Sequence, residues 1–508
     1  MSVRNGVIKS SITIVFFYFF AKVLSFLVEM IIASKYGACF ETDAYYLTEG
    51  TVMAISPLLT IGVWKVFMPE YKRLIVKNQE SDAVEFTESM LAFFLMLSVL
   101  LSLVFFLFPS IILNVFAPGY NEKQVEYSSD LIRVFSFIFV FGTVTIFPSA
   151  ILQSRSLFSK SQLKEIIVFL FPLIYLLVFS EFGQKGLAIS LLVGHMIAMF
   201  VMYYYLLPYF KISLSPKITI RKYGNILKLY PIACINAVLL QLNAVIDKMF
   251  SSTLVVGSIS FMNYGAKVIN FFNGIISTAI SMALFPYLAE MIAKKEDERF
   301  RSFFVGSISI LCAILFPMTC VLSLFSIDII SILFGHGKFS GDDIQITSKI
   351  LFIYGIGLPA MGITTIVNDI FYINKQVKIL MYTSVVNIIS NIILDFLLID
   401  KLGVVGLCMA TTISLYVSLL IKLFYMREIV SANRFLIGNI ISVMGACVFS
   451  MGTFYFIKKY MEEYFVGYFY HFICGVIIFF ALYLVVLQSN KYYRTQCMTI
   501  IMNLKKRI

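Results

Sequence analysis

Charged residues are scarce in this chain, and histidine and tryptophan are nearly absent. Of 508 residues, 13% are charged, three are histidine and one is tryptophan. A soluble globule of this length needs more polar surface to cover itself. Since His195, His336 and His471 lie far apart in the sequence, a histidine metal site or a Ser-His catalytic arrangement has little support. The chain also lacks the sizeable polar loop that a membrane-bound polymerase or glycosyltransferase would need, so we expect no enzyme.

Cysteine usage gives no sign of a disulfide framework or of a bound metal. The eight cysteines are scattered along the chain without a C-x-x-C spacing, which is the pattern expected of small buried residues. We therefore expect no metal site and no cofactor.

Apolar residues dominate what remains. Hydrophobic residues make up 60% of the chain, and the mean hydropathy is +0.91. Apolar stretches of about 20 residues, each long enough to cross a bilayer as a helix, recur about fourteen times. The first stretch carries Lys22 and Glu29 and lacks a small-residue cleavage pattern, so we expect it to be retained rather than cleaved as a signal peptide. The sequence predicts an all-α polytopic membrane protein.

The basic residues predict how the chain is oriented. Most of the 40 Lys and Arg residues fall in alternate loops when both termini are placed in the cytoplasm, as the positive-inside rule requires. We therefore expect a multi-pass protein of the bacterial inner membrane with both termini cytoplasmic. The net charge of +12 is dispersed over these loops, which argues against a nucleic-acid partner. The oligomeric state stays open.

Short motifs indicate an internal repeat. Residues in the first half recur in chain order in the second half, at offsets of about 220 residues: Pro69 and Pro286, Phe116 and Phe334, Gly119 and Gly337, Arg133 and Lys349, Gly186 and Gly406. Two six-helix lobes in parallel pseudo-repeat, with a substrate path between them, fit this pattern. Two further helices then remain at the C-terminal end.

This repeat predicts the division of the chain. We expect an N-lobe of six spans at 1–215 and a C-lobe of spans seven to twelve at 216–430. Spans thirteen and fourteen, at 431–490, have a possible role in covering a groove for a lipid tail. The stretch 491–508 is expected to be a basic cytoplasmic tail, either solvated or lying on the anionic inner leaflet.

Some basic residues fall inside the predicted spans, where a cation is costly unless it is paired, faces water or reaches the interface. Those near span ends, such as Lys65, can snorkel. Lys22 lies deep in span one, and Lys267 lies about 12 Å into span eight. Lys22 either pairs with Glu29, two turns away, or faces a cavity. Two deep lysines, one from each half, would suit a central site for a diphosphate.

Polar residues inside the spans allow two interpretations. Asp43 starts span two, where it can stabilise a helix N-terminus. In span seven Asp247 shares a face with other polar residues, and in span eleven Asn387 and Asn391 form a stripe with Asp395. These stripes either hold helices together by hydrogen bonds or coordinate a small cation.

A series of motifs carries a family resemblance. The chain resembles the MurJ/MviN family of lipid II flippases, within the multidrug/oligosaccharidyl-lipid/polysaccharide exporter superfamily. The likeness runs over nearly the whole chain and includes Tyr36-Gly37-Ala38, Thr42-Asp43-Ala44-Tyr45, Ala117-Pro118-Gly119-Tyr120, Gly257-Ser258-Ile259-Ser260 with Tyr264 and Lys267, Leu333-Phe334, Gly337, Phe339, Tyr354, Gly357-Leu358 and Phe371-Tyr372.

The resemblance implies a fourteen-helix fold with a central cationic cavity and a groove formed with the last two helices. It implies alternating access that carries a polyprenyl-diphosphate-linked saccharide, the peptidoglycan precursor lipid II, from the cytoplasmic to the outer leaflet. The family's cavity arginines fall on Lys22, Val28 and Lys267, and its second-span basic pair falls near Leu58-Leu59. Glu29 and Asp43 are further candidates for substrate binding.

The lost arginines keep other substrates open, because lysine does not grip a phosphate with two hydrogen bonds. The alternatives are a flippase for a capsule, exopolysaccharide or O-antigen repeat unit, and a cation-coupled multidrug exporter. The resemblance also implies coupling to Na+, H+ or the membrane potential, and a sodium site would fall on Asp247 and Asn391, with Asn387 beside it.

Overall fold

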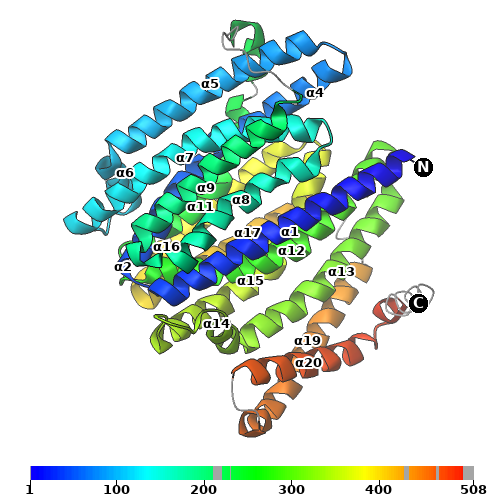
Figure 1. Ribbon diagram of the computed structural model, residues 1–508. Coiled ribbons are helices and arrows are strands. Elements are labelled where there is room, and N and C mark those ends of the chain that lie inside the picture. Colours follow the sequence, from blue (N-terminus) through cyan, green and yellow to red (C-terminus); the bar gives the residue numbers. More distant parts are fainter. Residues whose placement is uncertain (1, 210–219, 229, 428–433, 465–467, 496–508) are drawn as a thin grey trace. The chain divides into compact units, whose positions relative to one another are not determined.

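The computed structural model describes residues 2–209, 220–228, 230–427, 434–464 and 468–495. All regular elements in these ranges are helices, as the sequence predicts (Figure 1). By their internal contacts the residues fall into two compact units, Met1–Asn263 and Tyr264–Ile508. The predicted lobe boundary at 215–216 and most of the predicted basic tail lie outside the described residues, so both stay predictions.

The first unit contains eleven α-helices, two short 3-10 turns and one π-helical turn among its described residues, besides the start of α12. They are α1 (Ser2–Tyr36), α2 (Phe40–Ile55), α3 (Pro57–Gly62), the π turn Val63–Phe67, α4 (Met68–Val76), α5 (Glu80–Leu107), α6 (Pro109–Phe116), α7 (Glu122–Ser154), α8 (Phe158–Val178), the 3-10 turn Ser180–Phe182, α9 (Gly183–Leu206), the 3-10 turn Ile220–Tyr223, α10 (Gly224–Leu227) and α11 (Tyr230–Ser251).

The second unit takes most of α12, whose first residues belong to the first unit, and continues to the C-terminal end. Its helices are α12 (Ser258–Ala293), α13 (Asp297–Leu324), α14 (Ser326–Phe334), α15 (Gly341–Ile373), α16 (Val377–Leu402), α17 (Val404–Tyr425), α19 (Arg434–Tyr464) and α20 (Tyr468–Leu487).

Many of these helices are long and apolar enough to cross a membrane. Within the described residues, 11 segments meet that standard, and the shorter apolar helix His471–Leu487 follows them. On α5 the side chains of Leu100, Leu103 and Leu107 are at least half exposed along one face, as expected of a surface in contact with lipid. The chain is a multi-pass helical membrane protein. The expected count of about fourteen spans stays a prediction.

The two units repeat one succession of helices. A helix of 28 residues, a short helix and a helix of 33 residues follow one another as α5, α6 and α7, and again as α13, α14 and α15. Both 33-residue helices begin with a capping box, at Asn121 and Ser340, and both contain one internal proline, Pro148 and Pro359. The predicted parallel pseudo-repeat is confirmed.

Left-handed backbone turns repeat with the helices. Positive φ angles occur at Gly37, Asn78, Ser156 and Gly183 and recur about 220 residues later at Gly257, Lys295, Lys375 and Gly403. At the four non-glycine positions a helix ends, and the amide of the following residue bonds to the carbonyl five residues earlier, as Gln79 does to Leu74 at 3.0 Å. Each is a Schellman turn, which satisfies carbonyls that the helix end leaves free.

The first unit is held together on one side by a cluster of buried rings. Phe67, in the π turn, packs against Phe86 of α5 and Phe147 of α7, with ring centroids 5.5 and 4.9 Å apart. All three side chains are at most 1% exposed. This packing fixes the end of the long broken segment from α2 to α4 against α5 and α7, and so fixes α2 beside the cavity considered below.

The Schellman turns lead to a stability prediction. Lys375 has φ +59° and is exposed, and a side chain in that conformation costs roughly 1 kcal/mol that glycine avoids. We expect Lys375→Gly to raise the free energy of unfolding by about 0.5 kcal/mol, because the released strain exceeds the entropic cost of glycine in the unfolded chain, measured as a higher thermal midpoint in detergent. Arg301→Gly, at an exposed position inside α13, is the matched control and should lower stability by about 0.5–1 kcal/mol. A lower midpoint for Lys375→Gly would contradict the prediction.

Candidate functional site

Asp43 binds the N-terminal end of another helix. Its carboxylate accepts hydrogen bonds from the Gly257 amide at 2.6 Å, from the Ser260 amide at 2.7 Å and from the Ser260 hydroxyl at 2.6 Å. The side chain is only 5% exposed. A carboxylate at this place satisfies free amides and meets the positive end of the α12 dipole. Asp43 therefore fixes α2 to the start of α12. Within the described residues its carboxylate makes no capping hydrogen bond to α2, whose N-cap residue is Cys39, so it stabilises the N-terminus of a different helix from the one expected.

The segment 257–260 is shaped to receive that carboxylate. Gly257 has φ +94°, and a Cβ there would lie 2.9 Å from the Ala38 carbonyl oxygen. A larger residue would therefore push the segment away from the chain that leads into α2. Burial and the charge of Asp43 raise the pKa of the nearby Tyr120 phenol above its usual range, as expected for a buried group beside a carboxylate.

Glu29 joins α1 to two other helices. Its carboxylate accepts a hydrogen bond from the Tyr46 hydroxyl of α2 at 2.6 Å and one from the Asn263 amide of α12 at 3.4 Å. The side chain is 5% exposed. Glu29 and Asp43 thus share a feature that sequence analysis did not foresee: each links elements that are far apart in the chain.

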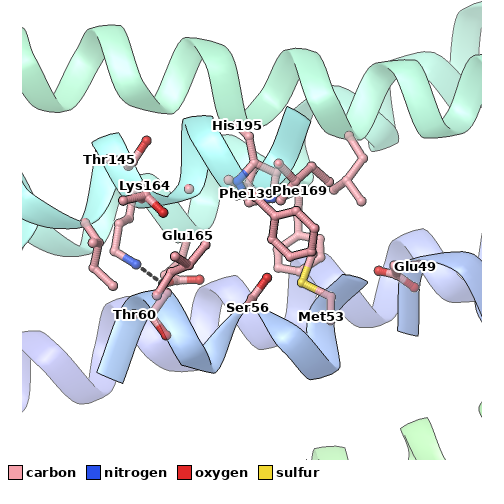
Figure 2. Close-up of a pocket in the computed structure, with 17 residues that line it drawn as sticks. Glu49, Met53, Ser56, Thr60, Phe139, Thr145, Lys164, Glu165, Phe169 and His195 are labelled. Carbon is pink, nitrogen blue, oxygen red and sulfur yellow. Dashed lines mark hydrogen bonds and ion pairs between the residues drawn. The ribbon is translucent and has the colours of Figure 1, made fainter. Parts of the chain in front are cut away.

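A mostly apolar cavity with several polar side chains in its wall lies inside the first unit, among α2, α3, α7, α8 and α9. It has a volume of about 350 Å³. Figure 2 shows Lys164 and Glu165 of α8 at one end, joined by an ion pair of 2.5 Å, with His195 of α9 between them and Glu49 of α2. Ser56 and Thr60 add hydroxyl groups to the wall. Four ionisable side chains therefore face a single cavity.

Lys22 lies beside this cluster. It is half-buried on α1, which packs along α8. It is near enough to interact electrostatically with the Glu165 carboxylate, whose ion-pair partner is Lys164. Lys22 therefore lies next to a group of acidic and basic side chains in the interior of the first unit.

Lys267 lies in the second unit, on the first part of α12. It is half-buried and follows Tyr264 by one turn. The Tyr264 side chain is fully buried and packs on Phe334 and Phe339, with ring centroids 5.2 and 5.5 Å away. These rings hold the part of α12 that carries Lys267. The meeting of Lys22 and Lys267 in one central cavity stays a prediction.

The polar residues considered for a cation site are buried. Asp247, in the first unit, is 5% exposed, and Asn391 and Asp395, in the second unit, are 0% exposed; Asn387 is half-buried. The Asn391 amide has no hydrogen-bond partner among the described residues. An unsatisfied buried amide costs roughly 1–3 kcal/mol, a cost that a bound cation would relieve. A joint site of Asp247 with Asn387 or Asn391 stays a prediction.

Lys248, next to Asp247, has a partner in the first unit. Its ammonium donates to the Tyr46 carbonyl oxygen of α2 at 2.7 Å. A Cβ at Gly50 would lie 2.0 Å from that ammonium nitrogen, so glycine is needed for the approach. Sequence analysis could place Lys248 beside an acid but could not foresee this backbone contact.

The Lys164, Glu165 and His195 group was missed by sequence analysis. Topology assigned Lys164 to a cytoplasmic segment, and His195 was set aside because no second histidine lies near it in the sequence. The signal that could have found the group was the presence of Glu165 and His195 in two consecutive apolar stretches, since an ionisable residue at membrane depth points to function.

The family model for the lipid II flippase MurJ matches residues 32–475 of this chain. A probable lipid II flippase MurJ from Buchnera aphidicola subsp. Acyrthosiphon pisum is 25% identical over 442 residues, which cover 84% of this chain and 86% of that protein. One from Thermotoga maritima is 26% identical over 433 residues, which cover 85% and 88%.

Solved structures agree in fold. A lipid II flippase MurJ in an inward closed conformation has a TM-score of 0.81 at 21% identity, covering 96% of this chain and 100% of that one. An inward-facing multidrug transporter of the MATE family, in the MOP superfamily, has a TM-score of 0.66 at 14% identity, covering 81% and 95%. With a family match that runs through both units and the described helices following the MurJ fold, the chain belongs to the lipid II flippase MurJ family.

Proposed function

We propose that this chain is a flippase for lipid II, which it carries from the cytoplasmic to the outer leaflet of the bacterial inner membrane by alternating access. The observation that supports the proposal most directly is the family match over residues 32–475, which spans both units. The reaction breaks and forms no covalent bond, so the residues need only bind, release and shield the polar head.

Lys22 and Lys267 are proposed to attract the diphosphate of lipid II. Both are half-buried on long apolar helices, one in each unit. A cation in such a place interacts strongly with an anion because little water competes. Lysine offers a compact charge but cannot form the bidentate hydrogen bonds of arginine. This suits a ligand that has to be released on the opposite side of the membrane.

Glu29 and Asp43 are proposed to support the substrate site by fixing helices. Their carboxylates are already engaged by Tyr46 and by the 257–260 segment, and both are nearly fully buried. Their part in substrate binding is therefore to hold α1 and α2 against the start of α12, so that Lys22 keeps its place.

The first prediction of this proposal concerns the lysines. Lys22→Gln and Lys267→Gln should each slow lipid II translocation about tenfold or more, since a hydrogen bond to a charged group contributes roughly 1.5–3 kcal/mol. Translocation is measured in vesicles containing the purified protein, with expression and thermal midpoint recorded alongside. Arginine at each position should retain transport. Parental rates for both glutamine variants, or loss of the folded protein alone, would contradict this assignment.

Glu165→Gln separates substrate binding from a packing role of Lys22. If Lys22 serves only to balance Glu165, neutralising Lys22 should lower stability. Because Glu165 is itself ion-paired with Lys164, the double variant Lys22→Gln/Glu165→Gln should then be as stable as Glu165→Gln alone. If Lys22 attracts the diphosphate, the double variant should remain slow.

Supplying a capsule-type repeat unit on the same polyprenyl diphosphate tests the alternative substrate, because the loss of the family's arginines leaves the glycan less tightly constrained.

A second prediction concerns coupling. We propose that Asp247 contributes to a sodium site with Asn387 or Asn391, supported by the burial of Asp247 and Asn391 and by the preference of hard cations for oxygen ligands. Asp247→Asn should abolish the dependence of transport on sodium and membrane potential. Asp369→Asn, at an acid that accepts a hydrogen bond from Ser281, is the control and should keep it. Unchanged dependence in Asp247→Asn would refute the site.

A third prediction concerns topology. We propose that both termini and the 294–301 segment face the cytoplasm and that the 121–130 segment faces outward, because basic residues gather in alternate loops. Single cysteines placed in these segments of a cysteine-free chain should react with an impermeant maleimide from outside intact cells only at 121–130. Labelling of the 294–301 segment from outside would overturn the orientation.

A further inference from the structure

A second cavity opens on the second unit. It is an open groove of about 580 Å³ formed by the N-terminal end of α14 and by one face each of α15 and α17. None of its lining residues was singled out for substrate or cation binding, and it lies wholly within the second unit.

The groove is polar at one end and apolar along the rest. On α15 the lining residues recur every three or four positions, first as Gln345, Ser348 and Lys349, then as Phe352, Ile353 and Ile356. From the first to the last of these the helix rises roughly 16 Å. That is about half of a hydrocarbon core roughly 30 Å thick. The groove therefore has the length of one lipid leaflet and the polarity order of an amphiphile.

Two of the hydroxyl groups in the wall already have hydrogen-bond partners. Ser348 donates to the Ser326 carbonyl oxygen at 3.3 Å, and Thr412 of α17 donates to the Ile353 carbonyl oxygen at 3.3 Å. The wall beyond Lys349 thus offers a ligand only hydrocarbon contacts. Phe352, Ile356 and Ile413 remain 40% to 44% exposed there, an apolar surface open to an acyl chain.

Lys349 supplies the charge at the polar end. Its side chain is exposed, and no ion pair is recorded for it within the described parts of the chain. Asp343, nearer the start of α15, accepts a hydrogen bond from the Ser340 amide in the capping box. Lys349 is thus available for an anionic group that lies at the head of the groove.

We propose that this groove is a binding site for an anionic phospholipid, with its phosphate at Lys349 and one acyl chain along Phe352, Ile356 and Ile413. An acyl chain spans one leaflet, as the groove does. A polyprenyl chain is much longer and would extend past the apolar end. The groove shares no lining residue with the proposed substrate site and would hold a lipid that stays bound while the substrate moves.

The test uses the single tryptophan of the chain. Trp64 lies in the first unit, so Trp64→Phe combined with Phe352→Trp places the only tryptophan in the groove. The purified full chain is reconstituted in vesicles that contain brominated phosphatidylglycerol or brominated phosphatidylcholine, and the quenching of tryptophan fluorescence gives relative lipid affinity. We expect phosphatidylglycerol to bind about fivefold more tightly, the ratio for roughly 1 kcal/mol from one lysine near anionic lipid.

Adding Lys349→Gln should bring the two affinities together, and Lys349→Arg should restore the preference. Lys401→Gln, an exposed lysine at the end of α16, should leave it unchanged. A preference that survives Lys349→Gln would overturn the proposal. So would displacement of the brominated phospholipid from the groove by a low mole fraction of undecaprenyl phosphate, because the groove would then hold a polyprenyl chain.

Discussion

Hydrocarbon offers no hydrogen bonds, so each polar group at membrane depth has to find its partner within the protein. The second unit shows this at a proline. Pro359 has no amide hydrogen, which leaves the Gly355 carbonyl of α15 without its helical partner. The Thr319 hydroxyl of α13 donates to that carbonyl at 3.0 Å. In the first unit the free amides at the start of α12 donate to the Asp43 carboxylate, so that each group has a hydrogen-bond partner. These contacts decide which helices lie together.

The same constraint explains how the repeat persists while side chains diverge. The turns after α4 and α12 use Asn78 and Lys295, and those before α8 and α16 use Ser156 and Lys375. Backbone hydrogen bonds define these turns, so residue type matters little. The surplus helix α20 is attached differently, through His471, which lies 3.0 Å from a carboxylate oxygen of Asp328 on α14. A buried polar pair therefore ties this additional helix to the repeated framework.

Sequence analysis predicted the features that depend on composition and spacing. The helical membrane fold, the repeat and the family followed from apolar lengths and from residues such as Phe116 and Phe334. The cavity in the first unit did not, because Glu165 and His195 meet only after α8 packs against α9. The partner of Asp43 was also beyond reach, since Gly257 lies 214 residues further on. The sequence could identify a buried acid, but not the distant amides that it binds.

The hydrogen bonds of Glu29 to α2 and α12 give α1 a point of attachment about which a tilt of the helix can be considered. Tyr46 and Asn263 hold the helix at one point, and the 35-residue helix extends from there toward Ser2. Along the helix, Lys22 is about 10 Å from the attachment point at Glu29, whereas Ser2 is about 40 Å from it. A tilt of about 5° would then shift Lys22 by roughly 1 Å and Ser2 by more than about 3 Å. Lys22 would therefore keep nearly the same position during a tilt of α1, whereas the start of the helix would move several times as far.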